Sequence, residues 1–334
     1  MKDKVNIIVP AIKLDEELLK CLSIINKISY KDFFVTIVVD YKNKNKLPKL
    51  KFKIEQLIVG KINMSEKRNL AAKKFKSTYI AFLDSDAHPT INWLKFAIKY
   101  LKQEIGDVVG GPSLPFTNQN YSEHICHLSK RSIFVTGYLN FRKYKAKKRY
   151  CDWLESCNLI MRRVFFLKYG GMDPKRYTGE DKEFFERAKR KNNNIKVFYS
   201  PNLFVYHRER RYVGFLLQRC CFGMDFLNLT KWNIGPKGLK PLLPVLVFSI
   251  FLFVVISKIT IVSKLNLLFP PLLILNLAIY FEIKKYIKSL KALFLTIITI
   301  NLANVAFALG SFIRIFGLRR LLVNKFYSYS RWNN

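Results

Sequence analysis

Acidic residues are scarce in this chain of 334 residues: 23 Asp and Glu stand against 58 Lys and Arg, a formal net charge of +35. No compact basic helix, zinc-ligand spacing or aromatic-basic RNA motif accompanies this excess, so nucleic acid is not an expected partner. The lysines are scattered over every segment. A surface facing anionic membrane lipids explains that distribution more simply, because each basic residue near such a surface adds about 1 kcal/mol of attraction.

Paired cysteines and a secretion signal are also missing. None of the six cysteines stands in a Cys-x-x-Cys pair, and the first residues lead into a short strand instead of an apolar signal segment. We therefore expect the front portion to stay in the cytosol with free thiols. Residues 123–127 contain Glu, His and Cys at spacings that imitate a zinc site, but no second paired cluster supports that alternative.

Long uncharged runs occur only in the last third of the chain. Residues 242–256, 265–281 and 292–313 approach the ~20 residues that cross a membrane, the first two being slightly short. A buried core helix is the alternative for any one run, but three in series without a polar face predict an integral membrane protein. The lysines between the second and third runs predict a cytosolic loop; they are Lys284, Lys285, Lys288 and Lys291.

The rest of the chain alternates short apolar strands with helices, which is the pattern of a parallel α/β sheet. Strands are expected at 5–10, 33–40, 57–59, 78–83 and 107–111, with late short strands at 194–199 and 203–206. Helices are expected at 15–25, from Ser65 as a cap to 75, at 90–101 and after the turn at 179–181. Residues 121–150 read as mixed helix and basic loop, and 212–232 as an aromatic helix at the membrane surface.

Acidic residues follow two of the predicted strands. Asp84 and Asp86 follow the apolar strand at 78–83, and Asp40 ends an earlier one. Ligands of open α/β sheets bind at the carboxyl edge of the strands. Two carboxylates one residue apart at that edge suit a hard divalent cation, which binds carboxylates together with substrate phosphates. The alternative is an Asp-rich turn that caps the next helix.

An ordered series of further motifs favours the metal site. The segments are Val5–Pro10, Val38–Asp40, Lys67–Ala71, Phe82–Ala87, Trp93–Leu94, Asn158–Arg163, Gly170–Asp173, Gly179–Asp181 and Pro201–His207. In order and spacing this series resembles the family-2 inverting glycosyltransferases with a GT-A fold. The resemblance implies an α/β, Rossmann-like and mostly parallel catalytic domain followed by transmembrane helices. The apolar tail is similar to that of the membrane-anchored exopolysaccharide-type branch of that family.

The resemblance also implies a nucleotide-sugar donor, a divalent metal (Mg²⁺ or Mn²⁺) and residue roles. Asp86 would ligate the metal and His207 would complete its site, whereas a packed histidine is the structural alternative for His207. Asp181 would be the general base that deprotonates the acceptor hydroxyl. A charge at a helix N-terminus is the alternative for Asp181.

Donor contacts are implied for Pro10, Asp40, Arg68, Asp84, Glu180 and Arg219. Asp40 would accept hydrogen bonds from the nucleotide base, and Asp84 would lie near the ribose or a metal-bound water. Glu180 would help to orient the reacting groups without reacting itself. Arg68 would approach the phosphates, unless it covers a helix face.

The sequence departs from the family at two places. Tyr41-Lys42-Asn43 replaces the usual acid and Gly-Ser after the second strand, so base contacts are expected to differ. The usual arginine of the segment after residue 207 corresponds to Cys221, and Arg219 would take its place as a phosphate clamp. The Gln-x-x-Arg-Trp pattern of processive synthases is absent, which favours addition of one sugar.

These features predict four parts: a cytosolic catalytic domain at 1–210, an interfacial helix and linker at 211–240, about three membrane helices at 241–315 and a basic tail at 316–334. The localisation expected is the cytoplasmic membrane, multi-pass, with the catalytic domain facing the cytosol. The tail's basic residues favour the same side as the lysine loop. Three full spans would prevent that, so one run would be re-entrant or interfacial.

The predicted function is a membrane-anchored, metal-dependent inverting glycosyltransferase acting on a lipid-linked glycan, a saccharide or a polyprenyl phosphate. The partners expected are the nucleotide sugar, this acceptor and membrane lipids. A sugar-1-phosphate nucleotidyltransferase is one alternative, but residues 9–12 lack its Gly-rich loop. A non-catalytic nucleotide-sugar-binding membrane scaffold is another, and it would be expected to lose Asp86 or Asp181.

Overall fold

The structure is a computed structural model that describes residues 3–42, 47–176, 178–230, 243–257 and 260–318. The chain forms two compact units, one of residues 1–117 and 141–208, the other of residues 118–140 and 209–334. Of the residues 1–210 expected to form the catalytic domain, 118–140 and 209–210 belong to the second unit. Most of the basic tail expected at 316–334 lies outside the described residues.

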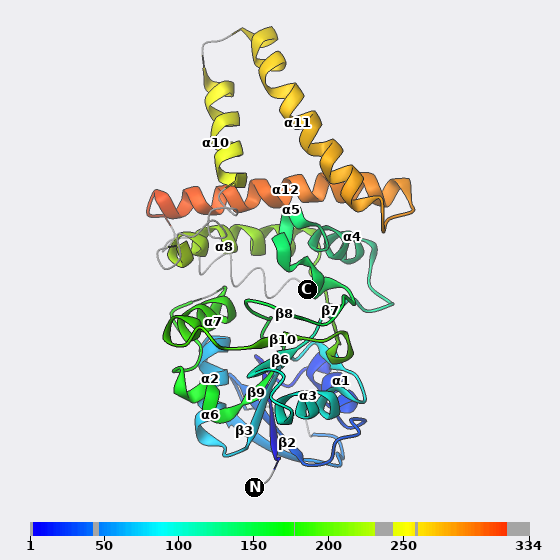
Figure 1. The fold of residues 1–334 in the computed structure, drawn as a ribbon, viewed down its shortest axis with the longest axis vertical. Helices are drawn as coiled ribbons and strands as arrows, with labels where there is room; N and C mark the ends of the chain where they lie inside the picture. Colours follow the sequence, from blue (N-terminus) through cyan, green and yellow to red (C-terminus); the bar gives the residue numbers. More distant parts are fainter. Residues whose placement is uncertain (1–2, 43–46, 177, 231–242, 258–259, 319–334) are drawn as a thin grey trace. The chain divides into compact units, whose positions relative to one another are not determined.

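An eight-stranded sheet forms the centre of the first unit, in the order β3-β2-β1-β4-β9-β6-β10-β8 (Figure 1). The parallel strands on one side are β3 (Lys53–Ile58), β2 (Phe33–Val39), β1 (Val5–Pro10) and β4 (Tyr79–Leu83). Next to β4, the strand β9 (Asn158–Arg162) runs antiparallel to both of its neighbours. The sheet continues with β6 (Val108–Gly110), β10 (Val197–Tyr199) and β8 (Arg149–Tyr150). The expected α/β fold with a mostly parallel sheet is confirmed.

Buried apolar side chains explain why β1, β2 and β4 lie at the centre. Almost every residue of these strands is buried, as in sheets covered by helices on both faces. The helices of this unit are α1 (Glu16–Ile25), α2 (Met64–Lys74), α3 (Trp93–Lys102), α6 (Arg163–Lys168) and α7 (Glu180–Lys191). The cap predicted for α2 is wrong: Asn63 accepts the Glu66 N–H at 2.8 Å, and Ser65 lies inside the first turn.

A small second sheet shapes one edge of the same unit. Its order is β5 (Ala87–Pro89), β11 (Val205–His207) and β7 (Ser113–Leu114). The turn between β4 and β5 is tight, because the Ala87 N–H bonds the Asp84 carbonyl at 3.0 Å. The antiparallel register places His207 opposite Ala87. The late strands expected before and after residue 200 are β10 and β11, joined through the 3-10 turn η2 (Pro201–Leu203).

The second unit is helical. It contains α4 (Tyr121–Lys130), α5 (Ile133–Thr136), α8 (Tyr212–Thr230), α10 (Leu243–Ile256), α11 (Ile261–Ile283) and α12 (Leu290–Ile315), and the 3-10 helix η1 (Gly137–Lys143) begins in it. Helices α8 and α12 lie side by side, and α10 and α11 extend away from α12 (Figure 1). A Cβ on Gly223 would collide with the Phe307 backbone, and one on Gly310 with the Cys220 backbone. These two glycines therefore let α8 and α12 approach backbone to backbone.

Two stretches in the described part of the chain are long and apolar enough to cross a membrane: Asn266–Ile283 within α11, and α12. The sequence predicted three spans, but α10 has only 14 helical residues, fewer than the ~20 that a span needs. The α11 stretch is 11% buried inside the protein, against 44% for α12. The difference arises because α12 packs along α8 while α11 keeps most of its apolar side chains exposed.

Candidate functional site

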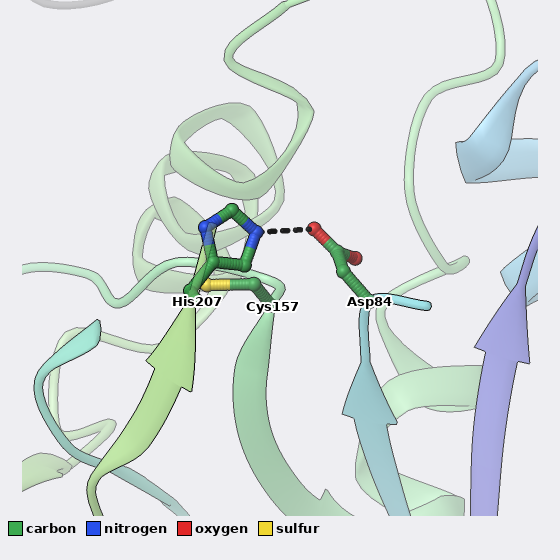
Figure 2. A group of neighbouring side chains, drawn as sticks. All are labelled: Asp84, Cys157 and His207. Carbon is green, nitrogen blue, oxygen red and sulfur yellow. Dashed lines mark ion pairs between the residues drawn. The ribbon is translucent and has the colours of Figure 1, made fainter. Parts of the chain in front are cut away.

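Asp84, Asp86 and His207 meet at the carboxyl edge of the main sheet. Asp84 and Asp86 occupy the tight turn after β4, and His207 ends β11 on the neighbouring strand ladder. The His207 Nε2 lies 3.3 Å from an Asp86 oxygen and 3.6 Å from an Asp84 oxygen. Figure 2 shows the imidazole facing Asp84. Residues about 120 positions apart in sequence thus form one cluster, as the order of motifs predicted.

The two carboxylates of this cluster favour a positively charged group beside them. Burial lowers the pKa of His207, but Asp86 and Asp84 outweigh it and raise that pKa to about 10. Burial raises the pKa of Asp84, yet Arg68 and His207 hold it well below its usual range. An imidazolium therefore balances two carboxylates at neutral pH. Two carboxylates and an imidazole are also a donor set that fits a divalent metal, which would replace that proton.

Arg68 links this cluster to the start of α7. Its side chain is buried and donates a 2.6 Å hydrogen bond to Asp84, while another guanidinium nitrogen lies 3.5 Å from Glu180. The alternative that Arg68 covers an exposed helix face is thereby excluded. A phosphate contact of Arg68 stays a prediction.

Glu180 and Asp181 form an acidic pair in the first turn of α7. Gly179 precedes them at φ 69°, a left-handed conformation that suits glycine. Asp181 accepts hydrogen bonds from the N–H groups of Ser156 at 3.3 Å and Lys182 at 2.8 Å. Burial and the neighbouring Asp181 raise the pKa of Glu180 to about 7. Burial also raises the pKa of Asp181, against an opposing effect of Arg142. A carboxylate with a raised pKa is a better proton acceptor near neutral pH.

Asp40 is held by a buried lysine. The Lys67 side chain is fully buried, forms an ion pair with Asp40 and donates to the Ala11 carbonyl at 2.5 Å. Asp40 and Pro10 are themselves buried, at the ends of β2 and β1. Lys67 thus fixes the carboxylate at the edge of the sheet. Contacts of Asp40 and Pro10 with a nucleotide stay predictions.

The neighbouring motifs hold the site in place. Asn69 exchanges two hydrogen bonds with the backbone of Met172, at 2.7 and 2.9 Å. A Cβ on Gly171 would collide with the Asn69 side chain. Asn69 in the segment Lys67–Ala71 thus anchors the segment Gly170–Asp173.

Sequence reasoning missed Cys157, which lies beside Asp84 and His207 (Figure 2). Because β9 runs antiparallel, the beginning of that strand lies at the edge where the parallel strands end. It also missed Lys143 and Glu155, which form an ion pair at 2.7 Å. The only usable signal was that Cys157 directly precedes the motif beginning at Asn158.

Other candidate residues lie elsewhere. Arg219 belongs to the second unit, where its guanidinium lies 5.2 Å from the Phe307 ring centre, and its phosphate contact stays a prediction. His88 is the middle residue of β5 and packs edge to face on Phe116. In the stretch once compared with a zinc site, Glu123 completes the capping box of α4 and His127 lies 3.7 Å from Glu209.

Comparison with known proteins gives one family match. The profile described as Glycosyl transferase family 2 matches residues 6–210. Curated protein sequences give no significant match.

Solved structures give fold-level similarity. The mannosyltransferase PcManGT from Pyrobaculum calidifontis, in complex with GDP-Man and Mn²⁺, is 12% identical with a TM-score of 0.61, covering 94% of this chain and 87% of that one. TarS of S. aureus is 19% identical with a TM-score of 0.44, covering 67% of this chain and 40% of TarS. TarS 1–349 in complex with UDP-GlcNAc is 16% identical with a TM-score of 0.46, covering 94% of this chain and 92% of that one. This chain thus covers about two fifths of the longer TarS chain.

Proposed function

The chain belongs to glycosyl transferase family 2, and on that premise we propose that it transfers a sugar from a nucleotide sugar to an acceptor hydroxyl with inversion. The observation that carries this proposal is the linked set of side chains at the sheet edge. Arg68 contacts Asp84 of the Asp84–Asp86–His207 cluster and Glu180 of the acidic pair. One buried guanidinium therefore links the proposed metal site to Glu180, the neighbour of the proposed base Asp181.

Asp86 and His207 are the residues proposed to hold a divalent metal, Mg²⁺ or Mn²⁺, with Asp84 beside them. When bound there, the metal supplies positive charge that offsets the charge growing on the leaving nucleoside diphosphate. PcManGT, which shares the fold at a TM-score of 0.61, has Mn²⁺ and GDP-Man in its complex. Arg68 helps to keep Asp84 ionised, so its carboxylate is available to a cation.

Asp181 is proposed as the general base. It takes the proton of the acceptor hydroxyl while that oxygen forms a bond to the anomeric carbon. The bond from this carbon to the diphosphate breaks on the opposite face, so the configuration inverts. Glu180 is proposed to orient the acidic pair. Because its pKa is raised to about 7, Glu180 is partly protonated at neutral pH and adds less negative charge beside Asp181.

The donor is proposed to bind at the sheet edge of the first unit. Asp40 and Pro10 would contact the base, Arg68 and Arg219 would approach the phosphates, and Asp84 would lie near the ribose. The buried pair of Asp40 and Lys67 supports the first assignment, because it fixes a polar group at the carboxyl edge of β2.

Membrane anchoring is proposed to run through α11, with the first unit on the cytosolic side. The exposed apolar side chains of α11 support this, because soluble surfaces rarely keep so many together. Lysines follow the helix directly, and Lys284 lies 4.4 Å from the Phe281 ring centre. Aromatic and basic side chains at a helix end are typical of the cytosolic membrane interface. The acceptor proposed is lipid-linked.

The experiment is turnover of the purified chain with a panel of nucleotide sugars, with Mg²⁺ or Mn²⁺, measuring nucleoside diphosphate release. We expect release with one donor, loss in chelator and loss in Asp86→Ala with the fold retained by circular dichroism. Full activity of Asp86→Ala, or wild-type activity in chelator, would contradict the metal assignment. Release of pyrophosphate from a sugar phosphate and a nucleoside triphosphate would identify a nucleotidyltransferase instead.

A further inference from the structure

A cysteine thiol belongs to the cation cluster. Ligand atoms of Asp84, Cys157 and His207 all lie within 4.8 Å of one another. Figure 2 shows the Cys157 side chain below the His207 ring, and Asp84 facing the edge of that ring. Two strand ladders set this geometry. Leu83 pairs with Asn158 in β4 and β9, which places Asp84 beside Cys157, and Ala87 pairs with His207 in β5 and β11.

A thiol is an unusual donor for the metals proposed above. Mg²⁺ and Mn²⁺ prefer carboxylate, carbonyl and water oxygens, whereas thiolate and imidazole favour zinc-like cations. Four-coordinate Zn²⁺ has ligands about 2.0–2.3 Å away, so neighbouring ligand atoms lie roughly 3.3–3.8 Å apart. The His207 Nε2 already lies 3.6 Å from Asp84 and 3.3 Å from Asp86. Within the group of Asp84, Cys157 and His207, the separations therefore have to shorten by about an ångström at most.

We propose that Asp84, Cys157 and His207 form a binding site for a thiophilic divalent cation of the Zn²⁺ class, overlapping the seat of the catalytic metal. Asp86, 3.3 Å from His207 but outside that group of three, is proposed as the fourth ligand once its carboxylate turns toward the cation. Binding breaks the S–H bond of Cys157 and removes the extra imidazolium proton, and both protons pass to solvent. Sites with mixed nitrogen, oxygen and sulfur ligands bind Zn²⁺ more tightly than Mn²⁺. Zn²⁺ is therefore expected to displace Mn²⁺.

The consequence is inhibition, and this part rests on the proposed function. Four protein ligands complete the coordination of Zn²⁺, as in structural zinc sites. No position then remains for a diphosphate oxygen of the donor. A cation that binds the protein more tightly than the working metal would therefore block the donor.

Co²⁺ binding to the purified full-length chain without nucleotide tests the site directly. Thiolate ligation gives a near-ultraviolet charge-transfer band, which we expect in the wild type and expect Zn²⁺ to abolish. Cys157→Ser should lose the band and bind Zn²⁺ at least about tenfold more weakly in competition with a chromophoric chelator. Cys151→Ser is the matched control, because Cys151 lies in the same unit and its thiol faces the Trp153 carbonyl. That control should behave as the wild type.

Two outcomes overturn the proposal: a wild type without the band, whatever the variants do, and a Cys157→Ser variant that keeps both the band and the Zn²⁺ affinity. In turnover with Mn²⁺, Zn²⁺ should inhibit the wild type at a concentration at least about tenfold below that needed for Cys157→Ser. Failure of the proposed function is distinguishable, because a chain that binds Co²⁺ through its thiolate but transfers no sugar retains this site.

Discussion

Replacing Asp181 by asparagine separates its two possible roles. Asp181 accepts hydrogen bonds from the backbone N–H groups of Ser156 and Lys182. Asparagine keeps one acceptor oxygen but turns an amide toward the second N–H, and an unsatisfied buried donor costs about 1–3 kcal/mol. Loss of a buried charge offsets part of that cost. We therefore expect a fall in melting temperature of only a few degrees.

The expected effect on catalysis is far larger. A general base contributes about 10²–10⁴-fold to the rate, so kcat of Asp181→Asn should fall at least about a hundredfold while donor binding stays nearly normal. The assay measures nucleoside diphosphate release together with donor affinity by calorimetry. Asp173→Asn is a matched control, since Asp173 also accepts a backbone N–H, from Lys175 at 2.9 Å. It should retain wild-type turnover.

Near-normal turnover of Asp181→Asn with a lowered melting temperature would show that Asp181 serves only to order the start of α7. The stereochemistry provides a second test. Nuclear magnetic resonance of the product should show the anomer opposite to that of the donor. A product with the donor's configuration would refute the single displacement from which the role of Asp181 follows.

Three further predictions concern stability. Arg68→Met should lower the unfolding free energy by about 2–3 kcal/mol in denaturant titrations, less than a fully buried pair because Asp84 is 32% exposed; a loss below about 0.5 kcal/mol would show that the link is not stabilising. Glu180 has a raised pKa, so its stabilising contribution is complete below its ordinary value of 4.5 and is lost as pH rises through about 7. Metal-free Glu180→Gln should therefore gain on the order of 2–3 kcal/mol over the wild type between pH 4.5 and 8, and an unchanged difference would contradict the burial effect. Gly310→Leu should separate α8 from α12 and cause aggregation in detergent, seen by size-exclusion chromatography, whereas exposed Leu309→Ala should not; a monodisperse Gly310→Leu protein would refute the backbone contact.

The sequence was sufficient where local pattern and strand ends determine structure. Buried runs such as Tyr79–Leu83 can only be central strands, and an acid that follows such a strand must lie at the sheet edge. His207 and Asp86 could be placed together because the motif order matched a known arrangement. Roles within the site are a different matter, since they depend on a donor and an acceptor.

The rest depended on pairings that no local pattern records. Cys157 reaches the site because β9 runs against its neighbours, a direction that its own residues do not reveal. The cap of α2 could be Asn63 or Ser65 by residue type, and tertiary geometry chose Asn63. The apolar run of α12 looked like α11, but Gly223 and Gly310 give α12 a protein neighbour along α8. Hydrophobicity alone does not distinguish lipid contact from helix contact.

The direction of the α8–α12 pair decides what can be cut from this protein. Tyr212 neighbours Thr299, and Gly223 accepts a hydrogen bond from Ser311, so the two helices run the same way. The chain must therefore return from the end of α8 to the start of α12, roughly 40 Å at 1.5 Å per residue. The segment containing α10 and α11 provides that return path. Truncation near residue 240 would remove α12, the helix that packs on α8. A short loop in place of the hairpin of α10 and α11 could not span the distance from the end of α8 to the start of α12. A soluble derivative would have to keep α12 and replace the hairpin by a linker of at least about a dozen residues.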